Sequence, residues 1–238
     1  MSKICNFQTK AVIWKEAIEI KRSSLIYIIG TIIFVLVMQI MAANQLLTNN
    51  DLPKASKEIL LGYSIIYISI MCIPFLGSTL LSRLMYEERL DSAVHVLLAT
   101  GMDQITLWIG KMFITYFVTY IVFITTTVIY YFYIYIMYEY SVIINFEIFL
   151  TAFIIMPFLA FGFLSLLGYT YWVIKNPQIF GMIFPIAFTI GGWNVAIKYI
   201  ERTPTALAIA IVIVVAVVIN TITYILVKKT SKSQITNI

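Results

Sequence analysis

The stretch TALAIAIVIVVAVVINTITYILV, residues 205–227, contains no charged side chain and decides the fold class. At a rise of about 1.5 Å per residue, a helix of this length crosses the hydrocarbon core of a bilayer, which is about 30 Å thick. The apolar residues are continuous rather than alternating, and backbone groups in lipid must find their hydrogen bonds within the segment. The stretch therefore predicts a transmembrane helix and argues against barrel strands.

Five further apolar runs predict an all-α membrane protein with six transmembrane helices. The composition agrees, because 61% of the residues are hydrophobic and 11% are charged, whereas about a quarter are charged in soluble domains. Asn176-Pro177 and Thr203-Pro204 mark helix starts. The fifth run is the shortest and contains Pro185, which predicts a broken or partly inserted span. The predicted spans are 25–43, 60–82, 112–137, 146–172, 178–195 and 205–227.

The basic residues predict the orientation of these spans. Twelve of the sixteen Lys and Arg residues fall on the side that holds both termini and the loop after the second span. We therefore expect a multi-pass protein of a cell membrane with both termini cytoplasmic. The formal net charge of +5 is dispersed along membrane edges without a groove-sized patch, so no nucleic-acid partner is expected.

Residues 1–24 are largely polar and precede the first span, which argues against a cleavable signal peptide. Apolar residues including Trp14 and Ile18 recur at helical spacing and predict an amphipathic helix in the headgroup layer, next to Lys15 and Glu16. The alternative is a basic flank that only fixes the topology. Residues 25–227 form the predicted transmembrane domain, and residues 228–238 are expected to be a cytoplasmic tail.

Ionisable side chains do not occur near the middle of any predicted span, which argues against an ion-coupled carrier. The polar groups and prolines within the spans are candidates for a transport path or for bending of the helices. Packing between helices is the alternative role for each of them. These candidates are Gln39, Pro74, Thr126, Pro157, Pro185 and Asn220.

The loop between the second and third spans, residues 83–111, is the main charged segment of the chain. A polar extension of the second span is followed by a short apolar stripe at helical spacing, and Gly101 ends this helix. Asp103 is suited to cap a second helix that enters the third span. The loop is thus either a docking element for another protein or an ordinary interfacial hairpin. The apolar stripe consists of Val94, Leu97 and Leu98.

Catalytic and metal-binding motifs are not found in this sequence. The single histidine, His95, has no partners for a zinc site, and neither a phosphate-binding loop nor a nucleophile elbow occurs. Cys5 and Cys72 fall in different compartments and do not predict a disulfide. We expect no enzymatic activity, metal or cofactor, so that energy for transport would have to come from another protein.

The same loop resembles the E-x-x-x-G-T-L-E-x-L-L-A-T-P and L-G-K segments of ABC-2 type transporter permeases. The matching positions are Glu88, Asp91, Ser92, residues 96–101 (VLLATG) and residues 107–111 (LWIGK). A W-K-E element at Trp14, Lys15 and Glu16 and the layout of six spans add to the resemblance. The sequence departs from the pattern at Ser92, His95 and Gly101, where the family often has glycine, glutamate and proline.

In that family the segment is a coupling helix that docks on a separate ATPase subunit. The resemblance implies a permease subunit of an ABC exporter, working with two ATPase subunits that hold ATP and Mg²⁺ and with a second permease copy or a sister permease. The loops predicted outside are too short for a binding domain, which favours an amphipathic or lipid-like cargo such as a peptide, toxin or drug-like molecule. The small size and a composition typical of low-GC bacteria, taken with the resemblance, imply export of antimicrobial or cytolytic peptides or immunity to them. The expected ATPase contacts are Glu87, Glu88, Arg89, Asp91, His95, Leu97, Leu98, Thr100, Gly101 and Met102.

Two other functions are compatible with the sequence. One is a non-transporting membrane sensor or assembly partner that uses the loop to hold a cytoplasmic protein. The other, less favoured because of the apolar span interiors, is an ion-coupled carrier.

Overall fold

The computed structural model describes residues 2–48, 53–91, 93–99, 101–174, 177, 179–181, 183–187, 189–191 and 205–230, without the side chains of residues 2–7, 95 and 205–209. All regular elements within these residues are helical, and no strand occurs among them. The elements, of which η1 and η2 are π-helical, are α1 (Ser2–Ser23), α2 (Leu25–Thr48), α3 (Lys54–Leu81), η1 (Ser82–Glu87), α4 (Glu88–Leu90), α5 (Ala93–Ala99), α6 (Gln104–Tyr138), α7 (Phe146–Leu150), η2 (Thr151–Ile155), α8 (Met156–Val173) and α10 (Thr205–Lys229).

Five helices in the described part of the chain are long and apolar enough to cross a membrane. They match five of the six predicted spans and confirm the expectation of an all-helical chain with the character of a multi-pass membrane protein. These helices are Leu25–Thr48, Lys54–Leu90, Gln104–Tyr138, Phe146–Val173 and Ala210–Lys229.

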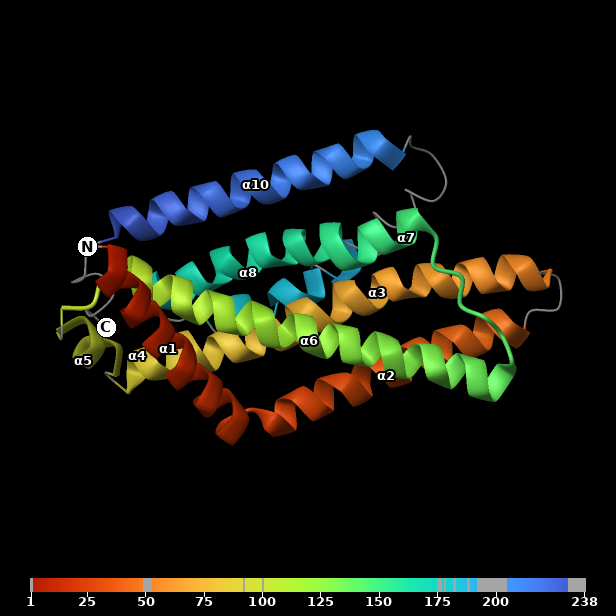
Figure 1. Ribbon diagram of the computed structural model, residues 1–238, viewed down its shortest axis with the longest axis horizontal. Helices are drawn as coiled ribbons and strands as arrows, with labels where there is room; N and C mark the ends of the chain where they lie inside the picture. The colour runs from red at the N-terminus through yellow and green to blue at the C-terminus, as the bar shows by residue number, and fades with distance from the viewer. Residues whose placement is uncertain are drawn as a thin grey trace.

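The remaining predicted span, 178–195, is only partly described. Its described residues belong to an apolar helical stretch, Ile179–Gly191, which is shorter than the roughly 20 residues that a span needs. The helices on either side run in the same direction, because α8 and α10 both end next to the segment that holds α4 and the start of α6 (Figure 1). The chain has to return along the bundle between Val173 and Thr205, and the short stretch falls within this return.

The helices α3 and α6 pack against each other at the centre of the bundle and reach beyond a bilayer. The helix that begins at Lys54 continues through η1 and α4 to Leu90. At about 1.5 Å per residue, the 35 residues of α6 extend over roughly 50 Å, well beyond a hydrocarbon core of about 30 Å. Both helices are therefore long enough to extend beyond the hydrocarbon layer of a membrane that they cross.

The first helix, α1, lies across one end of the bundle instead of along it (Figure 1). The same end carries α4, α5 and the last turn of α10, and we refer to it as the α5 end. The outward side of α1 includes Trp14 and Ile18, which are 71% and 51% exposed. This placement is compatible with the predicted interfacial helix, because an apolar face at the edge of a bundle can rest among lipid headgroups.

Two helices carry prolines that the sequence marks as sites of bending. Pro157 follows the π-helical segment η2, and the backbone carbonyl of Phe153 accepts a hydrogen bond from the Tyr120 hydroxyl of α6 at 3.0 Å. A proline lacks the N–H that would bond the carbonyl four residues earlier, so Tyr120 satisfies the group that Pro157 leaves unpaired. Pro74 is buried inside α3, and Pro185 is buried within the short helical stretch.

Candidate functional site

The closest approach between α1 and α6 occurs at Gly110. A β-carbon at this position would lie 2.7 Å from Cγ1 of Val12 on α1, which is far inside van der Waals contact. Val12, Glu16 and Ile20 are spaced four residues apart, and all three are buried, so they form the face of α1 that meets the bundle. The missing side chain of Gly110 thus lets α1 lie directly against α6 and brings Glu16 to the next residue, Lys111.

The Lys111 side chain is fully buried and binds carboxylates from two other segments. Its Nζ donates to Oε1 of Glu16 at 2.8 Å and to Oε2 of Glu88 at 2.5 Å, and also to the backbone carbonyl of Leu84 at 2.6 Å. Lys15 Nζ forms a short hydrogen bond with the other oxygen of Glu88. These contacts join α1, the η1–α4 segment and α6. Burial of such charges is tolerated only when they are paired and hydrogen-bonded.

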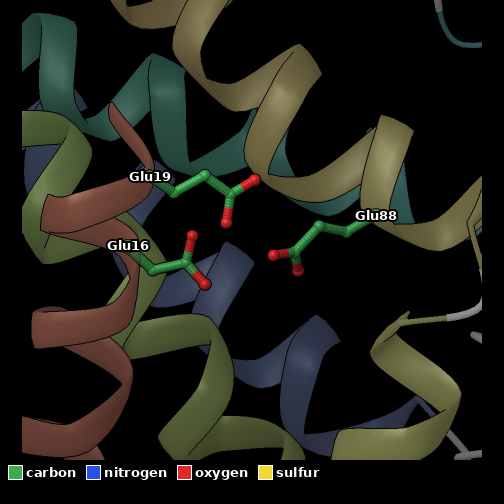
Figure 2. Close-up of side chains that lie close together, drawn as sticks. All are labelled: Glu16, Glu19 and Glu88. Carbon is green, nitrogen blue, oxygen red and sulfur yellow. The ribbon is translucent and has the colours of Figure 1, made fainter. Parts of the chain in front are cut away.

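We refer to Lys15, Glu16, Glu19, Glu88 and Lys111 together as the charged junction. Figure 2 shows the three carboxyl groups turned toward one another from α1 and α4, and one oxygen of each lies within 4.8 Å of one oxygen of the other two. Such a set can hold a divalent cation, but four of the six oxygens already lie within 4.0 Å of a lysine Nζ. The two ammonium groups supply the positive charge that a metal ion would bring.

The charged junction carries one excess negative charge when every member is ionised, since three carboxylates face two ammonium groups. Removal of the Glu16 carboxyl from water raises its pKa above the ordinary value of 4.5, with Lys111 opposing this shift and the negative charge of Glu88 adding to it. Its Oε2 atom is buried without a hydrogen-bond partner among the described residues. Glu16 is therefore the member best placed to take up a proton.

Two residues that flank α5 hold the ends of two other helices. Arg89 Nη1 donates to the backbone carbonyls of Tyr171 and Ile174 at 3.1 and 2.9 Å, at the end of α8. Gln104 Nε2 donates to the carbonyls of Val227 and Thr230 at 3.0 and 2.6 Å, at the end of α10. The last carbonyls of a helix have no partner within it and carry partial negative charge, so these side chains fix the ends of α8 and α10 to the loop.

The apolar stripe of the short helix α5 faces the inside of the chain, and other apolar residues of the loop face outward. Val94 and Leu98 are buried within the chain and Leu97 is partly buried, whereas Val96 is 64% exposed and Leu90 is 50% exposed. The stripe that the sequence assigns to docking on a partner thus packs mainly inward. Gly101 has a φ of 84°, which favours glycine and turns the chain toward α6.

The expected ATPase contacts divide into inward and outward groups. Glu88 and Arg89 are buried and bonded within the chain, while Glu87, Asp91 and Gly101 are exposed and Met102 is partly buried. The side chain of His95 and the whole of Thr100 lie outside the described residues, as does the predicted tail after residue 230.

The polar candidates within the spans take part in packing contacts. Asn220 of α10 bonds the carbonyl of Ala216 in its own helix at 2.9 Å and accepts from Ser165 of α8 at 3.4 Å. Buried Thr126 bonds the carbonyl of Val122. Gln39 donates to the sulfur of Met71 at 3.8 Å and also lines a cavity of about 180 Å³ between α2, α3 and α6.

Sequence reasoning did not find the roles of Lys111 and Gln104. In the sequence, Lys111 is one of several basic residues at predicted membrane edges, and nothing distinguishes Gln104 from other polar residues. The available signal was the presence of two charged elements, Lys15-Glu16 and Gly110-Lys111, each close to an apolar stretch of the chain. A charge that cannot reach water requires a partner, but a single sequence does not show which charges are buried.

No protein-family model, curated protein or solved structure matches this chain.

Proposed function

We propose that this protein is the membrane-spanning permease subunit of an ATP-driven exporter, with α4 and α5 as the element that a separate ATPase subunit moves. It would reside in a bacterial cell membrane with the α5 end and both termini in the cytoplasm. Two ATPase subunits holding ATP and Mg²⁺ and a second permease, identical or related, would complete the transporter. In this proposal ATP is hydrolysed by the ATPase subunits and not by this chain.

The observation that carries the proposal is the set of bonds around the short loop. Glu88 binds Lys111 at the start of α6 and Lys15 on α1, Arg89 binds the end of α8, and Gln104 binds the end of α10. A displacement of α4 would therefore act directly on α1, α6 and α8, and it would reach α10 through Gln104, the first residue of α6. An ordinary interfacial hairpin has no need for contacts with so many spans.

The two elements that resemble ABC-2 permeases also contact each other. The Lys15-Glu16 pair of the W-K-E element meets the Gly110-Lys111 pair at the charged junction. The resemblance and the contacts are independent observations, since the first concerns residue identity and the second concerns distances. Their agreement supports a coupling role for this region.

The outward residues of the loop suggest how an ATPase subunit would bind. Leu90 and Val96 are exposed apolar side chains at the α5 end, in the same loop as the exposed acidic residues Glu87 and Asp91. Apolar anchors surrounded by charged groups are typical of protein interfaces. We therefore assign the contact to these residues and give Glu88, Arg89 and Leu98 the role of supporting the loop from within.

The expected cargo is an amphipathic molecule such as a peptide, toxin or drug-like compound. The loops predicted on the far side are too short for a separate binding domain, so recognition would take place within the spans or at their cytoplasmic mouths. The outer faces of α2 and α10 are largely exposed and apolar, which leaves surface for lipid and for a second permease.

Isolation of the intact complex from native membranes tests the proposal. We expect the tagged full-length chain to be accompanied by an ATPase subunit in equal number, and the reconstituted complex to hydrolyse ATP faster when cargo is present. Retention of a cytoplasmic protein without ATPase activity would favour the sensor or assembly partner. Substrate movement driven by an ion gradient without ATP would favour a carrier, and either result would overturn the proposal.

A further inference from the structure

A cavity of about 330 Å³ at the α5 end lies apart from the charged junction. It is bordered by the first turn of α2, the last turn of α3, η1, the end of α8 and Gly181 of the stretch Ile179–Gly191. The lining side chains that matter for its chemistry are Tyr27, Ser78, Ser82, Arg83, Glu87 and Tyr171. One cation, one carboxylate and several hydroxyl groups are thus gathered around one space.

Arg83 is held in place with donor capacity remaining. Its Nη1 donates to the carbonyl of Ser23 at 2.5 Å, its Nε lies 3.5 Å from Oε2 of Glu87, and its guanidinium sits 5.1 Å from the centre of the Tyr27 ring. Its Nη2 has no hydrogen-bond partner in the described part of the chain. A fixed guanidinium with unused N–H groups is suited to bind a phosphate oxygen.

The π-helical segment η1 contributes three of the lining residues, namely Ser82, Arg83 and Glu87. Short π-helical turns inside longer helices are frequent at functional sites. Glu87 would repel a free phosphate ion but attracts an ammonium group. The pair Arg83 and Glu87 therefore fits a headgroup that carries both charges.

The cavity lies at the ends of two apolar helices, where lipid headgroups are found when such helices cross a bilayer. Tyr27 is near the start of the apolar helix α2, and Ser82 follows the apolar part of α3. Gly30 follows Tyr27 by three residues on α2, and a β-carbon at Gly30 would meet open space within 4 Å. The exposed residues Ile26, Ile29 and Ile33 provide apolar surface beside this gap, along which an acyl chain can lie.

We propose that this cavity binds a zwitterionic phospholipid of the phosphatidylethanolamine class, with its phosphate at Arg83, its ammonium group at Glu87 and an acyl chain on α2 beside Gly30. The proposal requires only that the chain resides in a membrane, and it does not depend on a role in export. Arg83 also bonds the carbonyl of Ser23 at the junction between α1 and α2, so a lipid bound to Arg83 would lie near this junction.

Native mass spectrometry of the full-length protein in detergent, titrated with phosphatidylethanolamine, tests this site. We expect Arg83→Gln to weaken binding about tenfold, the size expected for loss of a charge-assisted hydrogen bond. Arg22→Gln is the matched control, because Arg22 is exposed on α1 and does not line the cavity. Equal binding by Arg83→Gln and the unaltered protein, or an equal loss in both variants, would overturn the proposal.

Two further experiments identify the ligand and exclude misfolding as the cause of a loss of binding. Gly30→Leu keeps every charge, is favourable in a helix and is expected to displace the acyl chain with a similar loss of binding. Phosphatidylglycerol, which lacks the ammonium group, is expected to bind more weakly than phosphatidylethanolamine, with Glu87→Gln removing the difference. Displacement of the lipid by millimolar inorganic phosphate, or unchanged binding by Gly30→Leu, would contradict a lipid site.

Discussion

Lys111 joins three segments of the chain through one buried ammonium group. Its Nζ has two carboxylates and one backbone carbonyl as partners. A single sequence reveals that a lysine stands at a membrane edge, but it does not reveal whether that lysine faces water or protein. The pairing of the charges in the junction therefore could not be predicted from the sequence.

Replacement of Lys111 by methionine is expected to destabilise the protein strongly. The variant keeps the length of the side chain but leaves Glu16 and Glu88 buried without their shared cation, and breaking a buried pair costs about 3–5 kcal/mol. Lys15→Met is the matched control, since 44% of the Lys15 side chain is exposed and exposed pairs contribute about 1 kcal/mol or less. Thermal unfolding in detergent measures both, and equal effects would contradict the assigned role of Lys111.

Glu16 predicts a dependence of stability on pH. Because its pKa is raised in the folded chain, the folded state binds a proton more tightly than the unfolded state. The stabilisation that the folded state gains from binding this proton is fully present below pH 4.5, the ordinary pKa of a glutamate. It is lost as the pH rises through the raised pKa of Glu16. Glu16→Gln should remove this decline in melting temperature while Glu19→Gln, whose side chain is 40% exposed, retains it. An unchanged decline in Glu16→Gln would show that other groups cause it.

At the scale of helices, apolar runs predicted where spans lie but not which way their faces turn. The stripe of Val94, Leu97 and Leu98 was correctly recognised as apolar, yet Val94 and Leu98 are buried and Val96 is exposed. An apolar stripe on a helix beside a bundle packs on that bundle unless another surface covers it. The approach of α1 to α6 likewise depends on a glycine whose neighbour is nearly a hundred residues away in the chain, and no local pattern reveals such a contact.

Gly110→Leu is expected to release α1 from the bundle. A side chain at this position would overlap Val12, which lies 2.7 Å from the ideal β-carbon, so α1 has to move away. Hydrogen–deuterium exchange should show faster exchange in α1, around residues 9–20, without a change in α8 or α10. Gly30→Leu, which introduces the same residue into a helix at an open position, should leave exchange in α1 unchanged. Slow exchange in α1 of Gly110→Leu would mean that the helix docks elsewhere.

At the scale of the whole molecule, composition and the lengths of apolar runs were sufficient to predict an all-helical membrane chain. Hydrophobicity limits such chains to helices and sets their minimum length, so the amino-acid sequence alone was enough to locate the five helices that are long and apolar enough to cross a membrane. The arrangement around α3 and the bonds from the loop to α8 and α10 could not be predicted, because they join residues up to 126 positions apart. The loop matters to the whole molecule through these long-range bonds.

A change on the outside of α5 should separate assembly from folding. Val96 is 64% exposed, so Val96→Glu leaves the packing of the loop intact but places a charge where an ATPase subunit would bind an apolar anchor. We expect at least about a tenfold weaker association with the ATPase, as is typical for loss of an interface anchor, with the same melting temperature as the unaltered protein. Val96→Ile, which keeps the apolar surface, should preserve both assembly and cargo-stimulated hydrolysis. Full activity of Val96→Glu would place the contact elsewhere on the α5 end. Leu98 is buried, so a loss of activity in Leu98→Glu together with a lower melting temperature would reflect only this buried position.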